Sequence, residues 1–309
     1  MIETWLTGIY PRSEMLIEAT RLNVINLNEL FIKEKKQDVQ IQIKEGLKYI
    51  SDPLLDWNDH LRPFTLELEG IEEGALSRFY ENNTFYRQPI IKNKIKTKGK
   101  ILTKAFNWLP QKKCKIDLMD PYTFADLADD RYYKKNELID DIANVYIKEI
   151  NNLPRRFEMI QFNAPSLALT ESKQEIEIAK HAMKNISDKI KRKICLNLCF
   201  GDVSNNIDEF LDFKIDILGI DFISTKIDNL EERNIDKDLL CGIVNAQNTR
   251  LETKTELLQI MQKINKKLNP PQIAITNNRD FEFLPKKFAK RKLRNFTSAS
   301  KYIQRKLEK

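Results

Sequence analysis

The chain has 309 residues, of which 41% are hydrophobic and 31% are charged, with only 8 Gly and 11 Pro. This composition is typical of a globular protein with a sizeable core, and it excludes collagen-like, low-complexity and largely disordered chains. The formal net charge of +7 is concentrated at one end, because residues 286–309 hold ten Lys and Arg residues and one Glu.

The first residues, MIETWLTGIYPRSE, lack the basic region and the apolar run of a signal peptide. No stretch reaches the ~18 uninterrupted apolar residues of a membrane span. The cysteines are too few and too scattered for a disulfide framework, at Cys114, Cys195, Cys199 and Cys241. We therefore expect a cytoplasmic protein with reduced thiols and no membrane association.

Eight short apolar runs have the length and composition of buried parallel strands. They lie at 4–8, 48–51, 115–119, 158–162, 194–200, 219–224, 239–245 and 272–276. Amphipathic stretches of helical period separate them, for example at 137–153, 173–186 and 255–268, and the last two follow possible N-caps at 170–172 and Thr253. Strand and helix alternating eight times predict an α/β protein folded as a single (βα)8 TIM barrel over residues 1–309.

Three segments depart from a plain barrel. Residues 53–113 are too long for one crossover between the second and third strands, and the alternating pattern at 89–106 predicts an inserted β-hairpin that turns at Lys98-Gly99. The first crossover, 12–46, predicts two helices with a turn between them. The basic segment 286–309 predicts an outer helix with a solvated basic side; the alternative is an anion-binding arm.

Barrel enzymes carry their reactive groups where strands end. Five segments spaced to fall at such strand ends are distinctive: Gly8 to Arg12, Asn82 to Pro89, Asp120 to Thr123 with Tyr132-Tyr133 downstream, Ile160 to Pro165, and Leu284-Pro285 with Ala289 and Lys292-Leu293. In this order along the chain they resemble segments of the cobalamin-independent methionine synthases. The resemblance is to the short single-barrel archaeal forms in particular, within the methionine synthase and uroporphyrinogen decarboxylase-like superfamily.

The resemblance implies methyl transfer from methyltetrahydrofolate, or an archaeal equivalent, to a homocysteine thiol bound to zinc. The family's four ligand positions fall here on Asn197, Cys199, Lys226 and Arg279. Of these four residues, only Cys199 is of a type that the family uses to bind zinc. Protonated Lys and Arg offer no lone pair, and their positive charges repel a zinc ion. We therefore expect no zinc and no other cofactor in this chain.

The resemblance also implies a pocket for the amino-acid group of homocysteine, and this pocket has likewise lost a binding group. Asn163 stands where the family has an Asp that holds the ammonium of homocysteine, which removes a charge-assisted hydrogen bond. We expect Tyr10 and Arg12 to line the barrel mouth. Arg12, Lys226 and Arg279 together predict a pocket for a carboxylate or phosphate; the alternative is that Lys226 and Arg279 pair with the neighbouring acids Asp228 and Asp280.

Three functional hypotheses follow. The first is a zinc-less companion of a zinc-bearing methionine synthase barrel, which binds the methyl donor, a methylated pterin or folate, or holds the catalytic barrel. In this role Asn82, Asn83 and Arg87 contribute to a binding surface; the alternative is that they only anchor the hairpin. The second is a metal-independent methyltransferase with Cys199 as nucleophile or Asp52 as general base. The third is an anion- or nucleic-acid-binding barrel; nucleic acid is not expected, because the basic tail lacks the interleaved aromatic residues that single strands favour.

Overall fold

The computed structural model of the chain describes residues 2–80 and 82–307. They form two compact units. The first comprises residues 2–56, 199–205 and 219–307, and the second comprises residues 57–80, 82–198 and 206–218. Strand β8 (Ile217–Asp221) contains the boundary between them.

Three parallel strands form the centre of the first unit. β1 (Glu3–Thr4) runs beside β10 (Ile273–Asn277), and β10 runs beside β9 (Asp238–Val244). The end of β8 joins this group through Phe222, whose backbone N–H donates to the Gly242 carbonyl at 3.1 Å. Side chains such as Leu240 and Ile275 are completely buried, and each such burial stabilises the fold by about 1.5–3 kcal/mol.

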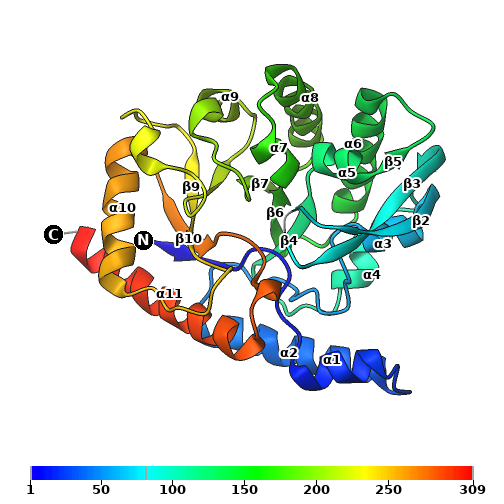
Figure 1. Cartoon of the computed structure of the whole chain (residues 1–309), viewed down its shortest axis with the longest axis horizontal. Coiled ribbons are helices and arrows are strands. Elements are labelled where there is room, and N and C mark those ends of the chain that lie inside the picture. The colour runs from blue at the N-terminus through cyan, green and yellow to red at the C-terminus, as the bar shows by residue number, and fades with distance from the viewer. Residues whose placement is uncertain (1, 81, 308–309) are drawn as a thin grey trace. The chain divides into compact units, whose positions relative to one another are not determined.

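The long helices of the first unit pack on one another. They are α1 (Glu14–Arg21), α2 (Leu27–Glu45), α10 (Lys254–Leu268) and α11 (Lys286–Leu307). Figure 1 shows α11 in red, running beside both α2 and α10. The crossover from β8 to β9 is different, because the only helical segment there is the single 3₁₀ turn η2 (Ile227–Asn229). Two more short turns are η1 (Ser204–Asn206) and η3 (Phe281–Phe283).

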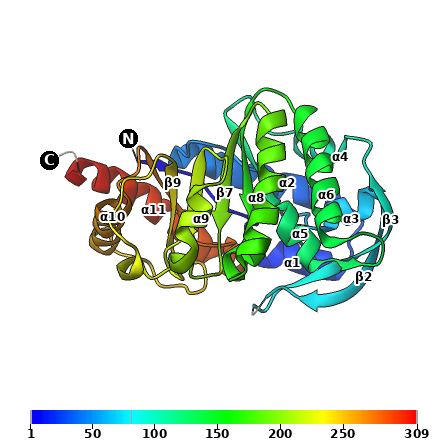
Figure 2. The same cartoon turned by 90° about the horizontal axis from the view of Figure 1, so that it is seen from above.

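The second unit contains three more parallel strands, β4 (Cys114–Met119), β6 (Phe157–Asn163) and β7 (Lys193–Leu198). Their register aligns side chains in layers, so that Gln161 lies between Asp117 and Cys195. The helices that follow these three strands in the chain are α5 (Pro121–Leu127), α6 (Lys135–Asn151), α7 (Pro165–Leu169), α8 (Lys173–Lys189) and α9 (Ile207–Leu211). α6 and α8 lie side by side (Figure 2).

The inserted segment is a hairpin, but its predicted position was wrong. It pairs β2 (Glu69–Arg78) with β3 (Phe85–Lys96), and a short strand, β5 (Asp129–Asp130), lies beside β3. The segment after Lys98-Gly99 forms α4 (Ile101–Phe106) rather than a return strand, and α3 (Arg62–Glu67) precedes the hairpin. The sequence pattern missed β2 because its Glu and Gly residues have low strand propensity.

The predicted strand at 48–51 is also absent as a strand, since only Ile50 makes an isolated bridge. Lys48 donates its N–H to the Thr4 carbonyl at 2.9 Å, but the Gln42 side chain then takes both backbone groups of Ser51, at 2.9 and 2.8 Å. A side chain from α2 thus replaces the strand ladder. β1 is shorter than predicted and β8 begins and ends earlier, whereas the other five predicted strands are confirmed with small shifts of their ends.

The helix predictions are confirmed, including two helices in the first crossover and a C-terminal helix. Ser172 and Thr253 cap α8 and α10, since their hydroxyls accept from the N–H groups of Glu175 and Glu256. Of the helices in residues 2–80 and 82–307, none is long and apolar enough to cross a membrane.

Candidate functional site

Arg279 follows β10 and is held by several contacts. Its side chain is 7% exposed, and its Nη2 donates to Asp221 Oδ2 at 3.2 Å and to Ser224 Oγ at 3.1 Å. The guanidinium also lies 4.2 Å from the centre of the Phe200 ring. Its charge is therefore balanced by a buried carboxylate and an aromatic face, and not by Asp280 as the sequence suggested.

Asp221, at the end of β8, organises this cluster. Its fully buried carboxylate accepts from the backbone N–H groups of Phe200, Ile223 and Ser224 and from the Asn278 amide at 3.1 Å. Sequence reasoning did not select Asp221 as a site residue. The sequence did contain one indication, since Asp221 lies inside the predicted buried strand 219–224. A buried carboxylate requires hydrogen-bond or ionic partners, which suggests a polar cluster around it.

Phe200 has an unusual backbone. Its φ is 75°, in the left-handed region that costs a non-glycine residue about 1–2 kcal/mol. The N–H bond to Asp221 and the contact with Arg279 hold this conformation. Strain of this kind concentrates at functional loops, and here it follows Cys199, which is 3% exposed.

Two loops of the first unit hold the segment around Arg279. The Asn277 side chain bonds both backbone groups of Thr7, at 3.1 and 2.7 Å, and also donates to the Arg279 carbonyl at 2.7 Å. Asp280 Oδ1 accepts from Ile9 N–H at 2.6 Å. Gly8 fits between them with φ 70°, and a Cβ there would lie 1.6 Å from Asp280 Oδ1.

Asp52 is held in an ion pair. Its carboxylate lies 2.9 Å from Lys35 Nζ and accepts from Leu54 N–H at 2.7 Å, while Lys35 also contacts Asp56 at 2.9 Å. Burial raises the pKa of Asp52 to about 6, although the Lys35 charge opposes this shift. The contacts describe a carboxylate that anchors the loop after residue 51.

Tyr10 and Arg12 belong to the same region of the first unit. Arg12 donates from Nε to the Leu55 carbonyl at 2.6 Å, lies 5.3 Å from the Phe31 ring centre, and has its pKa lowered by burial. Burial raises the pKa of Tyr10 well above its ordinary value. Its Oη is enclosed and has no hydrogen-bond partner within the described chain.

Lys226 is exposed, and its backbone makes two hydrogen bonds: its N–H donates to Asp202 Oδ1 at 3.4 Å, and its carbonyl accepts from Asn229 N–H at 3.0 Å. The neighbouring Asp228, suggested by the sequence as its partner, lies instead 3.6 Å from Lys263 of α10. Arg12, Lys226 and Arg279 thus have separate surroundings.

In the second unit, Asn163 and Asn197 belong to a buried polar network. Asn163 Oδ1 accepts at 2.9 Å from both the Asn197 amide and the Gln161 amide. Gln161 Oε1 in turn accepts from Lys115, which forms a 2.6 Å ion pair with Asp117 although both side chains are almost completely buried. The acceptor of Asn163 is therefore occupied by neighbouring amides.

The predicted surface residues of the hairpin make mainly local contacts. Arg87 donates its backbone N–H to Asp59 at 3.2 Å and a guanidinium N–H to the Gly74 carbonyl at 3.3 Å. Asn82 is partly buried and donates to the Phe79 carbonyl at 3.4 Å, whereas Asn83 is exposed.

The side chains at the predicted zinc positions do not fit a tetrahedral zinc site. Arg279 brings a buried cation, and Asn197 donates its amide to Asn163. No group of three or more His, Cys, Asp or Glu side chains arranged for a metal ion occurs in residues 2–80 and 82–307. The four cysteines all lie in the described part of the chain, where they are buried and form no disulfide. Burial raises the pKa of Cys114 to about 11 and those of Cys195 and Cys241 above their ordinary value.

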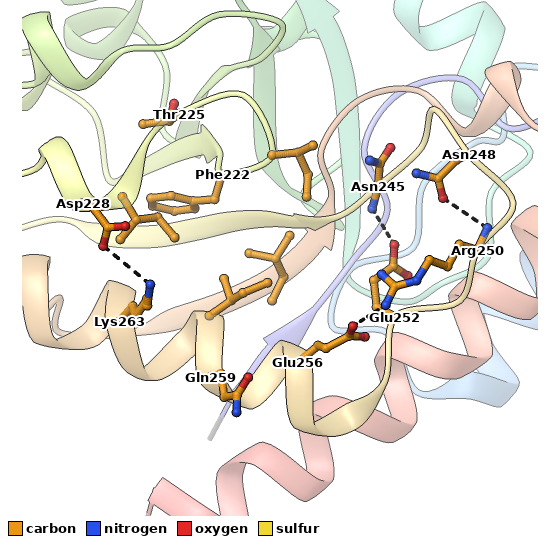
Figure 3. A pocket seen from close by; sticks show the side chains of 14 residues that line it. Phe222, Thr225, Asp228, Asn245, Asn248, Arg250, Glu252, Glu256, Gln259 and Lys263 are labelled. Carbon is orange, nitrogen blue, oxygen red and sulfur yellow. Dashed lines mark hydrogen bonds and ion pairs between the residues drawn. The ribbon is translucent and has the colours of Figure 1, made fainter.

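A cavity of about 470 Å³ lies within the first unit, between the segments that follow β8 and β9 and helix α10 (Figure 3). Its wall includes Phe222, Ile243 and Ile260, and its polar lining includes Arg250 and Glu252. The sequence pattern could not reveal it, because the cavity depends on how η2, the loop 245–253 and α10 pack.

Solved structures place this fold among the barrels of vitamin B12-independent methionine synthases. A B12-independent methionine synthase from Shewanella sp. W3-18-1, in complex with selenomethionine, has a TM-score of 0.72 at 15% identity, covering 91% of this chain and 90% of that one. A putative enzyme of the same kind from Listeria monocytogenes has a TM-score of 0.69 at 15% identity, covering 98% and 99%. The predicted class, an α/β (βα)8 barrel with an insertion, is confirmed.

The family is shown by sequence. Residues 69–269 match the model of the cobalamin-independent synthase N-terminal domain, and the chain belongs to this family. Similar curated proteins include the methionine synthases of Saccharolobus solfataricus, 25% identical over all of this chain and 97% of that protein, and of Pyrococcus furiosus, 23% identical over all of this chain and 95% of that protein.

Proposed function

We propose that the chain is a zinc-less companion of a zinc-bearing methionine synthase barrel, and that it serves methyl transfer to homocysteine by binding the methyl donor, a methylated pterin or folate. The match to the N-terminal domain model supports a companion role. The methionine synthases among its relatives support methyl transfer as the process it serves.

The observation that carries the zinc-less part is the environment of Arg279. A zinc ion at this position would have to displace a buried guanidinium from Asp221, and this would leave the Arg279 cation without its carboxylate partner. Separating a buried pair in this way costs about 3–5 kcal/mol. An unactivated methyl group requires a thiolate as nucleophile, and a thiol with a pKa near 8.5 is mostly protonated at neutral pH without a metal.

Elemental analysis of the purified chain tests the zinc-less part. We expect far less than one zinc per chain after incubation with excess Zn²⁺ and desalting. The single variant Arg279→Cys should stay zinc-poor because Asn197 and Lys226 remain, whereas the triple variant Asn197→His, Lys226→Glu, Arg279→Cys should gain zinc. One tightly held zinc in the unaltered chain, lost together with activity, would refute the proposal.

Calorimetry tests donor binding. We expect methyltetrahydrofolate or a methylated archaeal pterin to bind, and homocysteine to bind at least tenfold more weakly, because Asn163 offers no charge to the ammonium. The variant Asn163→Asp restores the carboxylate and should narrow that gap. Tight homocysteine binding by the unaltered chain, with no donor binding, would contradict this role.

Co-purification tests the partner. The tagged chain should retain the zinc-bearing synthase of the same cell and raise its rate of methyl transfer. Absence of both binding and stimulation would eliminate the companion role. The alternative of direct catalysis by Cys199 or Asp52 has less support, because Lys35 and the backbone N–H of Leu54 hold the Asp52 carboxylate.

A further inference from the structure

Large apolar side chains are exposed on α1, on α2 and in the turn between them. Met15, Ile17, Leu22 and Ile32 are between 53% and 62% exposed, and Ile25 is completely exposed. They are five of the twelve exposed large apolar side chains of the described chain. Because α1 and α2 contact each other, these residues belong to one helical hairpin, residues 14–45, which we call the α1–α2 hairpin (Figure 1). Apolar exposure concentrated in this way marks an interaction surface.

Helix α2 buries charged residues and leaves an apolar one exposed. Glu34 and Asp38 are buried and pair with Lys286 of α11, and the buried Lys35 also pairs with a carboxylate. Ile32, in the same helix, stays exposed. A helix on the surface of a monomer normally does the reverse, so the exposed side of α2 has the character of an interface.

The charges beside these apolar side chains are balanced in sign. Glu14 and Glu29 are negative, and Lys33 and Lys36 are positive. All four are exposed and have no ion pair within residues 2–80 and 82–307, whereas the other exposed charges of α1 pair with each other. A strongly acidic or strongly basic partner would therefore leave half of these charges facing like charges. A partner that carries both signs fits this surface.

Glu29 and Lys36 lie on either side of Ile32 along α2. Glu29 precedes Ile32 by three residues and Lys36 follows it by four, so the three side chains share one face of the helix. The two charges are about 4.5 and 6 Å from Ile32 along the helix axis. A twofold axis through Ile32 would place Glu29 of each copy beside Lys36 of the other. This face is therefore complementary to itself.

The exposed apolar area is sufficient for a dimer. The five exposed side chains supply roughly 500 Å² of apolar surface per copy, compared with the about 800 Å² of total surface that each partner buries in a standard interface. The half-buried Val24, Leu27 and Leu30 extend the same surface. A lipid surface fits less well, because helices that lie on membranes carry an excess of Lys and Arg on their polar side.

We propose that the exposed side of the α1–α2 hairpin binds the same surface of a second copy of this chain, and that the protein is a twofold-symmetric dimer. Ile32 lies at the centre of this interface, and Glu29 and Lys36 pair across the axis on both sides of it. The proposal does not depend on the proposed function, because it needs neither a methyl donor nor a companion barrel.

Analytical ultracentrifugation of the full chain tests the dimer. We expect a dimer at micromolar concentration, and Ile32→Asp should weaken its association at least tenfold, because the variant places two carboxylates at the centre of the interface. Leu169→Asp is the matched control, since Leu169 of α7 is 50% exposed and lies outside the hairpin. This control should remain dimeric. A monomer at hundreds of micromolar, or undiminished association of folded Ile32→Asp, would overturn the proposal.

A charge exchange tests the twofold arrangement. Glu29→Lys and Lys36→Glu each bring like charges together across the axis, so each variant alone should dimerise at least fivefold more weakly at low salt. A mixture of the two should form heterodimers of nearly the original strength, because each chain supplies the charge that the other lacks. This recovery also shows that both variants are folded.

The double variant with both changes in one chain is the second control, and it should dimerise as the unaltered chain does. Failure of the mixture to recover association would overturn the twofold arrangement. A monomeric chain that instead uses the α1–α2 hairpin to retain the zinc-bearing barrel would overturn the second copy as the occupant of this surface.

Discussion

At the scale of single residues, the pair of Asp221 and Arg279 affects both stability and chemistry. The carboxylate keeps three backbone N–H donors whether or not the arginine is present, whereas the guanidinium has one carboxylate partner in the recorded contacts. The pair is therefore asymmetric. Removing Asp221 leaves the buried Arg279 cation without a carboxylate partner. Removing Arg279 leaves an Asp221 carboxylate that still accepts hydrogen bonds from the backbone.

We expect Asp221→Ala to lower the free energy of unfolding by about 3–5 kcal/mol, the typical cost of leaving a buried charge without its partner. Arg279→Met should cost clearly less, because it removes the cation and keeps an apolar contact with Phe200. Urea unfolding of both variants measures the difference. Equal losses would contradict this asymmetry and would show that the ion pair itself, and not the backbone contacts of Asp221, supplies most of the stability.

A pH dependence follows from buried carboxyl groups. Burial raises the pKa of Asp120 to about 7, although hydrogen bonds from Thr123 and Tyr122 oppose this shift. Between the unfolded value of 3.8 and about 7, the folded chain keeps a proton that the unfolded chain has released. Its contribution to the unfolding free energy therefore falls as the pH rises through this range.

Asp120→Asn tests this expectation. The amide keeps an acceptor oxygen for the first turn of α5 but does not titrate. Urea unfolding across the pH range should give a flatter stability profile for the variant than for the unaltered chain. Asp38 and Asp52, whose pKa values burial raises to about 6, should preserve part of the slope. An unchanged profile would contradict the assignment to Asp120.

The sequence offers candidate site residues at strand ends, but it does not indicate their partners. The family resemblance places Arg279 after the last strand, and in the structure this residue follows β10. Its partner, Asp221, is 58 residues away in the chain, while the sequence offered the adjacent Asp280. Local patterns describe neighbours along the chain, and a buried ion pair forms between loops that only the fold brings together.

At the scale of elements, predictions succeeded where hydrophobic period decides the structure and failed where tertiary hydrogen bonds decide it. The long helix α6 follows from its hydrophobic period, and α8 and α10 follow from their period and their N-caps. β2 forms only because β3 supplies its ladder, and residues 48–51 lose theirs to the Gln42 side chain. The residues of β2 and of 48–51 do not by themselves indicate either outcome.

The loop between β1 and α1 offers a test with a built-in control. Gly8 and Gly46 both have left-handed backbones, with φ of 70° and 77°. A Cβ at Gly46 meets nothing within 4 Å, whereas one at Gly8 meets Asp280 Oδ1. We expect Gly46→Ala to cost about 1–2 kcal/mol from the backbone alone, and Gly8→Ala to cost more because the Asp280 to Ile9 contact must also move. Similar unfolding midpoints for the two variants would show that the loop yields freely.

At the scale of the whole molecule, the excess of positive charge resides largely on α11. The helix carries nine Lys and Arg residues and no acid between Lys286 and Leu307. Lys286, Lys292 and Arg294 pair with acids of α2 and of the loop 245–253. The exposed side includes two like-charge pairs one turn apart, Lys287 with Arg291 and Lys301 with Arg305, and each pair costs a few tenths of a kcal/mol.

Two charge reversals on the exposed side of α11 distinguish the effect of net charge on stability from the effect of the helix dipole. Lys287→Glu lies in the first turn, where a negative charge suits the helix dipole, and it relieves the repulsion with Arg291; we expect a gain of about 0.5–1 kcal/mol at low salt. Arg305→Glu changes the net charge equally but places the negative charge in the last turn, so it should gain less or lose stability. Thermal unfolding at low and high salt compares the two variants, and screening by salt should reduce the difference between them.

Equal shifts of the two unfolding temperatures would mean that overall charge repulsion, and not the helix dipole, governs this surface. A gain in either case would indicate that the basic side is kept at some expense of stability, as a surface that contacts anions would be.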